Sequence, residues 1–132
     1  FRTIDSRHPD DQSLSQMGQT IREGVQRIAD QGGLSFELEQ IFYYAPVPFD
    51  SSCVAAVDGA AQSCGYSARK IVTGAGHDAC FIAHAAPTSM VFIPCIDGIS
   101  HNEVEDIEPE WSTAGANVMF HAILDKAERS GD

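Results

Sequence analysis

A histidine next to a carboxylate, on a turn that follows an apolar run, is the feature of this sequence best suited to chemistry. His101 and Glu103 come after the apolar residues 90–93 and a glycine-containing turn. Catalytic groups are often held on a loop at the end of a rigid strand. Imidazole binds zinc well when an acceptor orients its second ring nitrogen, so His101 is a candidate metal ligand and Glu103 its candidate brace. The alternative is an ordinary exposed or capping histidine, and one histidine alone cannot hold zinc.

A second candidate is the run Gly74-Ala75-Gly76-His77-Asp78-Ala79. Two glycines after a strand let backbone N–H groups approach a carboxylate or a developing oxyanion closely. The spacing is not that of a nucleotide-binding loop, which needs a third glycine or a Walker lysine. The alternative is a tight strand-to-helix turn in which Asp78 caps the helix. The residues alone leave both interpretations open.

The third candidate is Arg7, in the segment Ile4-Asp5-Ser6-Arg7-His8-Pro9-Asp10-Asp11 at the end of an expected strand. A guanidinium group binds a carboxylate through two parallel hydrogen bonds. In so acidic a chain, Arg7 would also supply the local cation that an anionic ligand needs. The alternative is a simple ion pair with one of the three nearby aspartates.

The elements that must position these residues follow from periodicity and from helix and turn signals. Apolar residues at steps of three and four predict a helix over 11–31, begun by Asp10 or Asp11 and ended by glycine. Alternation predicts strands over 1–8 and 34–40, and the continuous apolar run 89–94 predicts a parallel strand buried on both faces. The other expected elements are a hinge at 46–48, a helix over 52–64 capped by Asp50 or Ser51, a strand over 69–72, a helical turn through 81–82 and a helix over 109–128.

Composition and charge exclude several classes of function. The formal net charge of −11 argues against a nucleic-acid partner, because binding to phosphates needs a basic face. No apolar run approaches the ~20 residues that a membrane-spanning helix needs, so no membrane partner is expected. The four cysteines lack the Cys-x-x-Cys spacing of a zinc ribbon, which favours reduced, structural thiols in a cytoplasmic protein.

The three segments occur in the order found in a known family. Together they resemble the C-terminal portion of the N-carbamoyl-L-amino-acid hydrolase, β-ureidopropionase and allantoate amidohydrolase family, within the aminoacylase/carboxypeptidase clan of dizinc enzymes. The resemblance implies an α/β fold class. Residues 1–45 would be the end of an inserted α+β lid or dimerisation domain, and residues 46–132 the C-terminal part of a zinc-peptidase-like catalytic domain. Because family members are much longer, we expect a C-terminal fragment that is inactive alone.

The resemblance also implies roles for particular residues. His101 is similar to the last metal-ligating histidine of the family, and Arg7 to a lid arginine that binds the substrate carboxylate. Gly76 and His77 would line the substrate-binding site. Two divalent metal ions are implied, with zinc preferred and manganese or cobalt as alternatives. The remaining ligands and the general-base glutamate have no matching positions here, so no catalytic residue is assigned to this chain.

The expected function is metal-dependent hydrolysis of a linear C–N bond in an N-carbamoyl amino acid or ureido compound. The expected partners are a small anionic substrate and a second copy of the enzyme, joined through the lid domain. One rival is a peptidase or aminoacylase of the same clan. A second is a cysteine hydrolase that uses Cys80 with His77, although a thiol in apolar surroundings is a poor nucleophile. A third is a non-catalytic dimerisation piece.

Overall fold

The computed structural model describes residues 2–129, and its contacts divide the chain into two units. Unit 1 comprises the described residues up to Pro48 together with Val72–Ala75. Unit 2 comprises Phe49–Ile71 and the described residues from Gly76 onward. The assignment of residues 1–45 to a lid and of 46–132 to a catalytic domain stays a prediction. No helix between residues 2 and 129 combines the length and apolar character needed to cross a membrane.

Unit 1 is built on one long helix, α1 (Asp11–Gly32), close to the predicted span of 11–31. Asp10 is its N-cap, and its side chain accepts a hydrogen bond from the Ser13 N–H. Gly33 ends the helix in the left-handed conformation, with φ 61°, and its N–H bonds back to the last turn. Both signals act locally, which explains why the sequence predicts this helix well.

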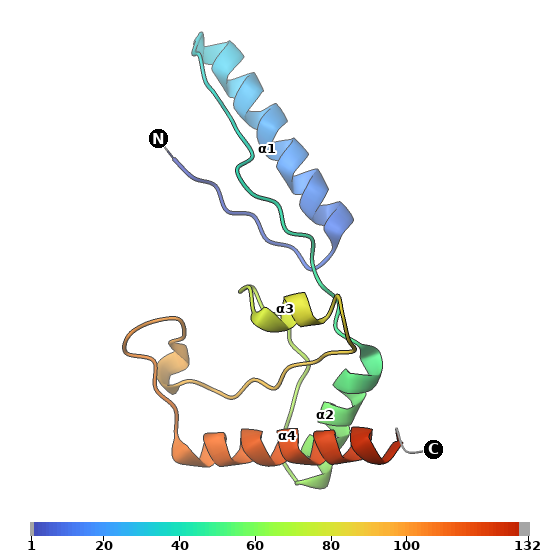
Figure 1. The fold of residues 1–132 in the computed structure, drawn as a ribbon. Helices are drawn as coiled ribbons and strands as arrows, with labels where there is room; N and C mark the ends of the chain where they lie inside the picture. The colour runs from blue at the N-terminus through green and yellow to red at the C-terminus, as the bar shows by residue number, and fades with distance from the viewer. Residues whose placement is uncertain (1, 130–132) are drawn as a thin grey trace. The chain divides into compact units, whose positions relative to one another are not determined.

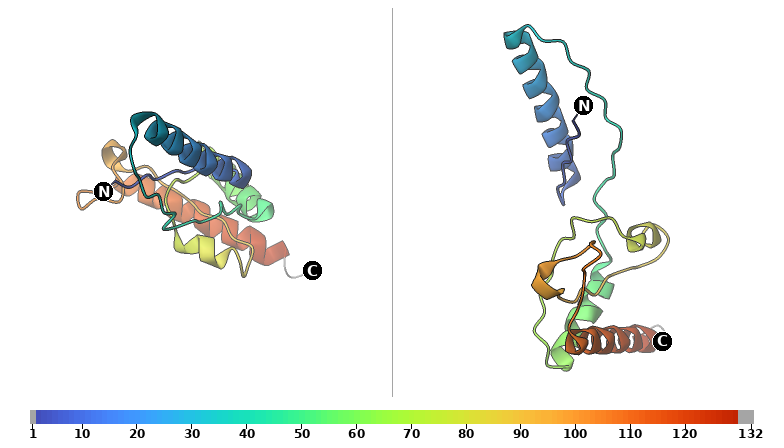
Figure 2. Two further views of the ribbon diagram at one scale, coloured as in Figure 1. Left: turned by 90° about the horizontal axis from the view of Figure 1, so that it is seen from above. Right: turned by 90° about the vertical axis from the view of Figure 1, so that its left-hand side faces the viewer.

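After Gly33 the chain reverses and runs beside α1 as an extended segment (Figures 1 and 2). Arg22 donates a hydrogen bond to Gln40, and the Tyr43 hydroxyl donates to Asp11, so side chains join the segment to the helix. The strands predicted over 1–8 and 34–40 do not form among the described residues of unit 1. A strand requires a neighbour for its backbone hydrogen bonds, and neither segment has one here.

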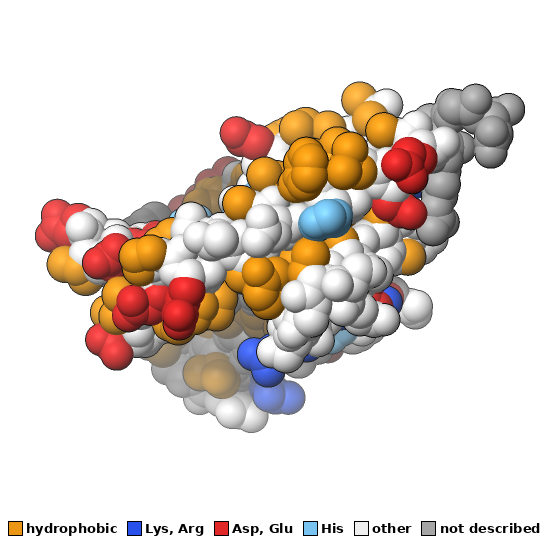
Figure 3. Space-filling view, turned by 90° about the horizontal axis from the view of Figure 1, so that it is seen from below, with side chains coloured by type: hydrophobic (Ala, Val, Ile, Leu, Met, Phe, Trp, Pro, Cys, Tyr) orange, Lys and Arg blue, Asp and Glu red, His pale blue; other side chains and the backbone are white. Residues whose placement is uncertain are grey.

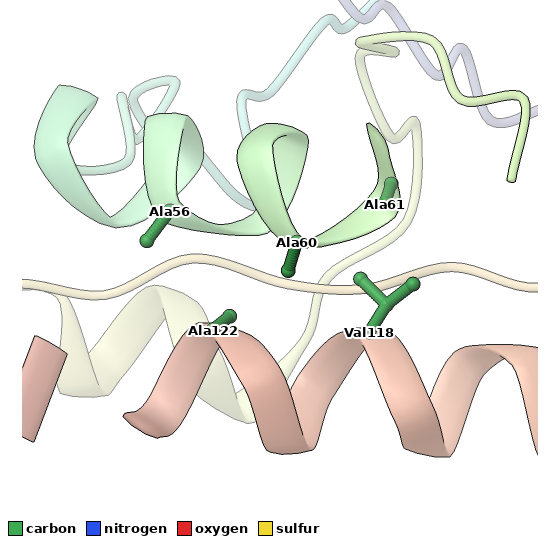
Figure 4. Close-up of a cluster of buried hydrophobic side chains, with 5 residues drawn as sticks. All are labelled: Ala56, Ala60, Ala61, Val118 and Ala122. Carbon is green, nitrogen blue, oxygen red and sulfur yellow. The ribbon is translucent and has the colours of Figure 1, made fainter. Parts of the chain in front are cut away.

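The core of unit 2 is the contact between α2 (Ser51–Ser63) and α4 (Pro109–Arg129), the only two described helices that pack together. It consists of small side chains from both helices, drawn in Figure 4: Ala56, Ala60, Ala61, Val118 and Ala122. Val57 and Val91 pack against this cluster. Because four of these five residues are alanines, the helix backbones come close together, and the core stays small.

Both helices of this core lie near their predicted positions of 52–64 and 109–128. Asp50 caps α2 and accepts hydrogen bonds from the N–H groups of Ser52 at 3.0 Å and Cys53 at 2.9 Å. These bonds, with the Ser52 hydroxyl first among them, lower the pKa of Asp50 to about 2. Gly65, with φ 75°, follows the end of the helix in the left-handed conformation that glycine adopts readily.

The other described elements of unit 2 are short: α3 (Asp78–Ile82) and the single turn η1 (Ile96–Gly98). The strands predicted over 69–72 and 89–94 are wrong for this chain, because both segments are extended without a hydrogen-bonded neighbour among the described residues. The run 89–94 is also not buried on both faces, since Phe92 is 43% exposed. The predicted α/β class is therefore not confirmed within the chain, whose described regular elements are helical.

Candidate functional site

His101 lies on a closed loop of unit 2, residues 95–106, which we call the His101 loop. The Ile96 N–H donates to the Asp106 carbonyl at 2.9 Å and so joins the two ends of the loop. Within η1, Asp97 and Gly98 have φ values of 56° and 69°, and the Ile99 N–H donates to the Ile96 carbonyl at 3.1 Å. Positive φ at both central residues is the geometry of a type I′ turn, for which Asp-Gly is a favoured sequence.

The carboxylate that braces this loop is Glu105, whereas the sequence pointed to Glu103. Glu105 Oε2 accepts the His101 N–H at 2.7 Å, and Glu105 Oε1 accepts the Cys95 thiol at 3.6 Å. Partial burial, then the negative charge of Glu105, raises the pKa of the Cys95 thiol and keeps it a donor. The predicted contact was a different one, between Glu103 and the second ring nitrogen of His101, and it is not found among the described residues. The Asn102 carbonyl accepts the Glu105 N–H at 3.0 Å and turns the chain back, towards the His101 backbone.

Two of the predicted site residues, His77 and His101, lie together. Their ring centroids are 6.2 Å apart with an interplanar angle of 69°, an edge-on arrangement. The His77 ring also meets Phe92 edge-on at 5.5 Å. His77 is half-buried at the start of α3, and His101 is exposed with φ 55°, in the left-handed region. The runs that carry the two histidines therefore meet in unit 2.

The glycine run behaves differently from the predicted turn. The N-cap of α3 is His77, and Asp78 lies in the first turn, so the expectation that Asp78 caps the helix is wrong. Neither Gly74 nor Gly76 is among the glycines with positive φ. A Cβ built on Gly76 would have no atom of the described chain within 4 Å, so the space beside this residue is open. Its predicted role beside a ligand stays a prediction.

Arg7 lies in unit 1 with its guanidinium held on two sides. Its Nε and Nη2 donate to the Asp5 carboxylate, with Nη2–Oδ2 at 2.6 Å, and Nη1 donates to the Gly74 carbonyl. The hydrogen bond from Arg7 is the main cause that lowers the pKa of Asp5, and Asp5 in turn raises the pKa of Arg7. The alternative interpretation, an ion pair between Arg7 and a nearby aspartate, is thus confirmed, with Asp5 as the partner. The same arginine also contacts the glycine run, which sequence reasoning did not foresee.

The residues described in this chain do not form a metal site by themselves. Between residues 2 and 129 no group of three or more histidine, cysteine, aspartate or glutamate side chains is placed to hold a metal ion. The exposed imidazole of His101 is of the right chemical type to serve as one ligand. The remaining donors of a zinc site would have to come from elsewhere.

Comparison with known families places the chain in a peptidase family whose relatives include amidohydrolases. The model of peptidase family M20/M25/M40 matches residues 6–125, and the chain belongs to this family. It is 46% identical over 126 residues to an N-carbamoyl-L-amino-acid amidohydrolase of Rhizobium meliloti, covering 96% of this chain and 30% of that protein. It is 35% identical over 103 residues to the allantoate amidohydrolase of Escherichia coli strain K12, covering 78% of this chain and 25% of that protein.

Solved structures agree with this assignment. An amidase of the hydantoinase/carbamoylase family from Burkholderia multivorans is 64% identical, with a TM-score of 0.89 over 92% of this chain and 29% of that one. A putative amidohydrolase/peptidase from Burkholderia cenocepacia is 54% identical, with a TM-score of 0.84 over 92% of this chain and 30% of that one. The resemblance drawn from the three sequence motifs is confirmed. The chain spans less than a third of the length of these relatives.

Proposed function

We propose that this chain is part of a hydrolase that cleaves a linear C–N bond in an N-carbamoyl amino acid or a related ureido compound. The observation that carries the proposal is the 46% identity, over 96% of the chain, to an N-carbamoyl-L-amino-acid amidohydrolase. Matches to an allantoate amidohydrolase and a ureidoglycolate hydrolase support the wider substrate class. All of these substrates join a carbamoyl or ureido nitrogen to a carboxylate-bearing carbon.

The proposed reaction depends on divalent metal, with zinc as the first choice and manganese or cobalt as alternatives. When bound, two such ions supply Lewis-acid activation of a water molecule and of the scissile carbonyl. His101 would provide one imidazole ligand from its loop. The other ligands and the proton-transferring carboxylate would come from residues outside this chain, consistent with its share of 30% of the Rhizobium meliloti relative.

Arg7 would bind the carboxylate of the substrate. A guanidinium has five N–H donors. Asp5 engages Nε and Nη2, and the Gly74 carbonyl engages Nη1, so donors remain on both terminal nitrogens. A substrate carboxylate could use these two, because the planar fork allows a second bidentate contact. Asp5 and Gly74 would hold the fork still and reduce the entropy lost on binding.

Gly76 and His77 would line the part of the substrate-binding site that holds the reacting end of the substrate. The open space beside Gly76 leaves room for a ligand next to the backbone. His77 lies edge-on to His101, so a substrate group near the metal ligand would also be near an imidazole donor or acceptor. We further propose that the complete enzyme is a cytoplasmic homodimer, joined through the domain to which residues 1–45 belong.

The proposal is tested by ammonia release from N-carbamoyl-β-alanine, an N-carbamoyl-L-amino acid and allantoate. The complete polypeptide that carries this chain is assayed before and after chelation, and again after zinc is restored. Release from one substrate that chelation abolishes and zinc restores would establish the class and the substrate branch together. Bound metal with no release from any of the three would overturn the carbamoyl-hydrolase assignment and leave a peptidase of the same family.

The role of Arg7 is tested by Arg7→Lys, which keeps the charge and loses the planar fork. We expect KM for the active substrate to rise by about tenfold or more with a smaller change in kcat, because a bidentate contact to the carboxylate is lost. Arg27→Lys, an equal change on an exposed face of α1, is the matched control. An unchanged KM in Arg7→Lys would remove Arg7 from the substrate site.

A further inference from the structure

Glu105 links three points of the His101 loop with one side chain. Its Oε2 accepts the His101 N–H at 2.7 Å, in the middle of the loop. Its Oε1 accepts the Cys95 thiol at 3.6 Å, at the start of the loop. Glu105 itself lies near the loop's end, beside the Asp106 carbonyl that accepts the Ile96 N–H at 2.9 Å. The exposed Glu105 carboxylate thus bonds to the start and the middle of a loop whose ends are already joined by a backbone hydrogen bond.

The backbone at His101 needs such support. Its φ of 55° is in the left-handed region, which a residue with a side chain enters at a cost and which the surroundings must impose. A charge-assisted hydrogen bond from a carboxylate to the N–H of this residue is one of the stronger restraints available. The backbone of a residue sets the direction of its Cα–Cβ bond. Fixing φ at His101 therefore restricts the positions that its imidazole ring can reach.

We propose that Glu105 is a positioning residue for metal ligation by His101. This inference rests on the proposed function, in which His101 is a ligand. In this role Glu105 contacts neither the substrate nor the metal. It acts through the His101 backbone and holds the imidazole where it lies 6.2 Å from the His77 ring. Removing the carboxylate would let the loop sample conformations in which the ligand is turned away, and metal affinity would fall.

The neighbouring Glu103 provides a matched control. It is exposed, and no hydrogen bond or ion pair of its side chain is found among the residues that the structure describes. Glu103→Ala and Glu105→Ala remove the same charge and the same side-chain atoms two residues apart on the same loop. A long-range electrostatic effect on the metal would therefore act in both variants, whereas the loss of a specific brace would act in one.

The experiment measures the dissociation constant for Zn²⁺ of the complete polypeptide, by competition with a chromophoric chelator. We expect Glu105→Ala to weaken binding by about 10- to 100-fold, the usual cost of losing a group that orients a metal ligand. Glu105→Gln is expected to lose less, because its amide oxygen can still accept the His101 N–H. Glu103→Ala is expected to stay within about twofold of wild type, as for an ordinary surface change.

Cys95→Ala keeps the proposal testable if Glu105→Ala does not fold. It removes the weaker of the two contacts and leaves the His101 N–H bond in place, so Zn²⁺ affinity should fall only slightly. Equal affinities in wild type and Glu105→Ala would overturn the proposal, and so would equal losses in Glu103→Ala and Glu105→Ala. A wild type that binds no Zn²⁺ would overturn it as well. Weakened Zn²⁺ binding in Glu105→Ala, with no hydrolysis of carbamoyl substrates by wild type, would refute the proposed function alone.

Discussion

The two long helices of this chain have nearly the same length and opposite surroundings. α1 has 22 residues and α4 has 21. α4 buries Val118 and Ala122 against α2, whereas the only buried residue of α1 is Ala29. On α1 the apolar stripe predicted from the sequence is half-buried at best, and Ile28 is 62% exposed. A similar helical signal therefore leads to a packed helix in one case and to an unpaired one in the other.

Exposed apolar surface is nevertheless present on both helices. On the outer side of α4, Met119, Phe120 and Ile123 are each more than half exposed. Figure 3 shows the hydrophobic side chains that gather on the face seen from below, over this helix. The inner face of α4 packs against α2, whereas neither its outer face nor the apolar stripe of α1 packs against another described helix. Four predictions separate these environments.

The largest effect is expected from overpacking the α2–α4 core. Ala60→Leu places extra carbons at a residue that is 7% exposed, against the facing helix. We expect a loss of about 1–3 kcal/mol in the free energy of unfolding. Ala55→Leu on the exposed side of α2 is the control and should change stability by less than ~0.5 kcal/mol. Equal thermal midpoints for the two variants would show that the helices do not pack as described.

The close contact between α4 and the segment 89–94 predicts opposite signs for two glycine substitutions. A Cβ at Gly115 would meet Ile93 Cγ2 at 2.5 Å, and this methyl group is held by a β-branched side chain that rotates little. Gly115→Ala should lose about 1 kcal/mol net, after the ~1 kcal/mol that alanine gains in a helix. Gly59→Ala in α2, with open space around it, should gain up to ~1 kcal/mol. Chemical denaturation of both variants checks the signs.

The cap of α2 predicts an acid-sensitive contribution to the stability of unit 2. The pKa of Asp50 is lowered to about 2 by the N–H and hydroxyl groups that it accepts. A lowered pKa stabilises the fold fully above the unfolded value near 4, and the contribution disappears as pH falls from about 4 towards 2. Asp50→Ala should lower the thermal midpoint by a few degrees at neutral pH. Asp50→Asn keeps a good cap but should lose the pH dependence in this range.

The smallest effect is expected on α1. Ile28→Gln replaces an apolar side chain that is 62% exposed, on a helix that packs against no other described helix. We expect a change within about 0.5 kcal/mol, because exposed positions away from special contacts are tolerant. A loss well above 1 kcal/mol in the free energy of unfolding of the complete polypeptide would contradict the description of α1 as a helix with an exposed apolar face, since it would mean that a partner covers this face.

The helices could be predicted from the sequence, and the strands could not. A helix forms its backbone hydrogen bonds between residues four apart in sequence. Local signals therefore predict where it begins and ends: the caps Asp10 and Asp50, and the glycines Gly33 and Gly65. A strand depends on a neighbour that is distant in sequence. The run 89–94 has the composition of a central strand but no hydrogen-bonded neighbour among the described residues. The chain covers 30% of the Rhizobium meliloti relative, which is why we expect the missing neighbours outside it.

The candidate site shows the same division. Residue types identified Arg7, His77 and His101 as candidates, and their roles stay predictions. Within unit 1 Arg7 contacts Gly74, and within unit 2 the His77 ring meets the His101 ring. The bond between Glu105 and the His101 backbone N–H was not foreseen, because it depends on a left-handed residue, which composition does not reveal. The Asp97-Gly98 pair was the signal that a reversing turn begins the loop, and it would have favoured a brace from further along the chain.

The left-handed backbone at His101 means that selection for stability and selection for activity favour different residues at this position. Glycine and asparagine adopt this conformation more readily than most residues. Laboratory evolution for heat resistance alone should therefore collect these residues at position 101, whereas evolution for turnover should retain histidine. Asp97, with a similar φ of 56° and no assigned chemistry, should drift to the same residues under either regime. Asp97 thus serves as a control within the same loop. It shows which substitutions the backbone conformation alone favours, against which retention of histidine at position 101 can be judged.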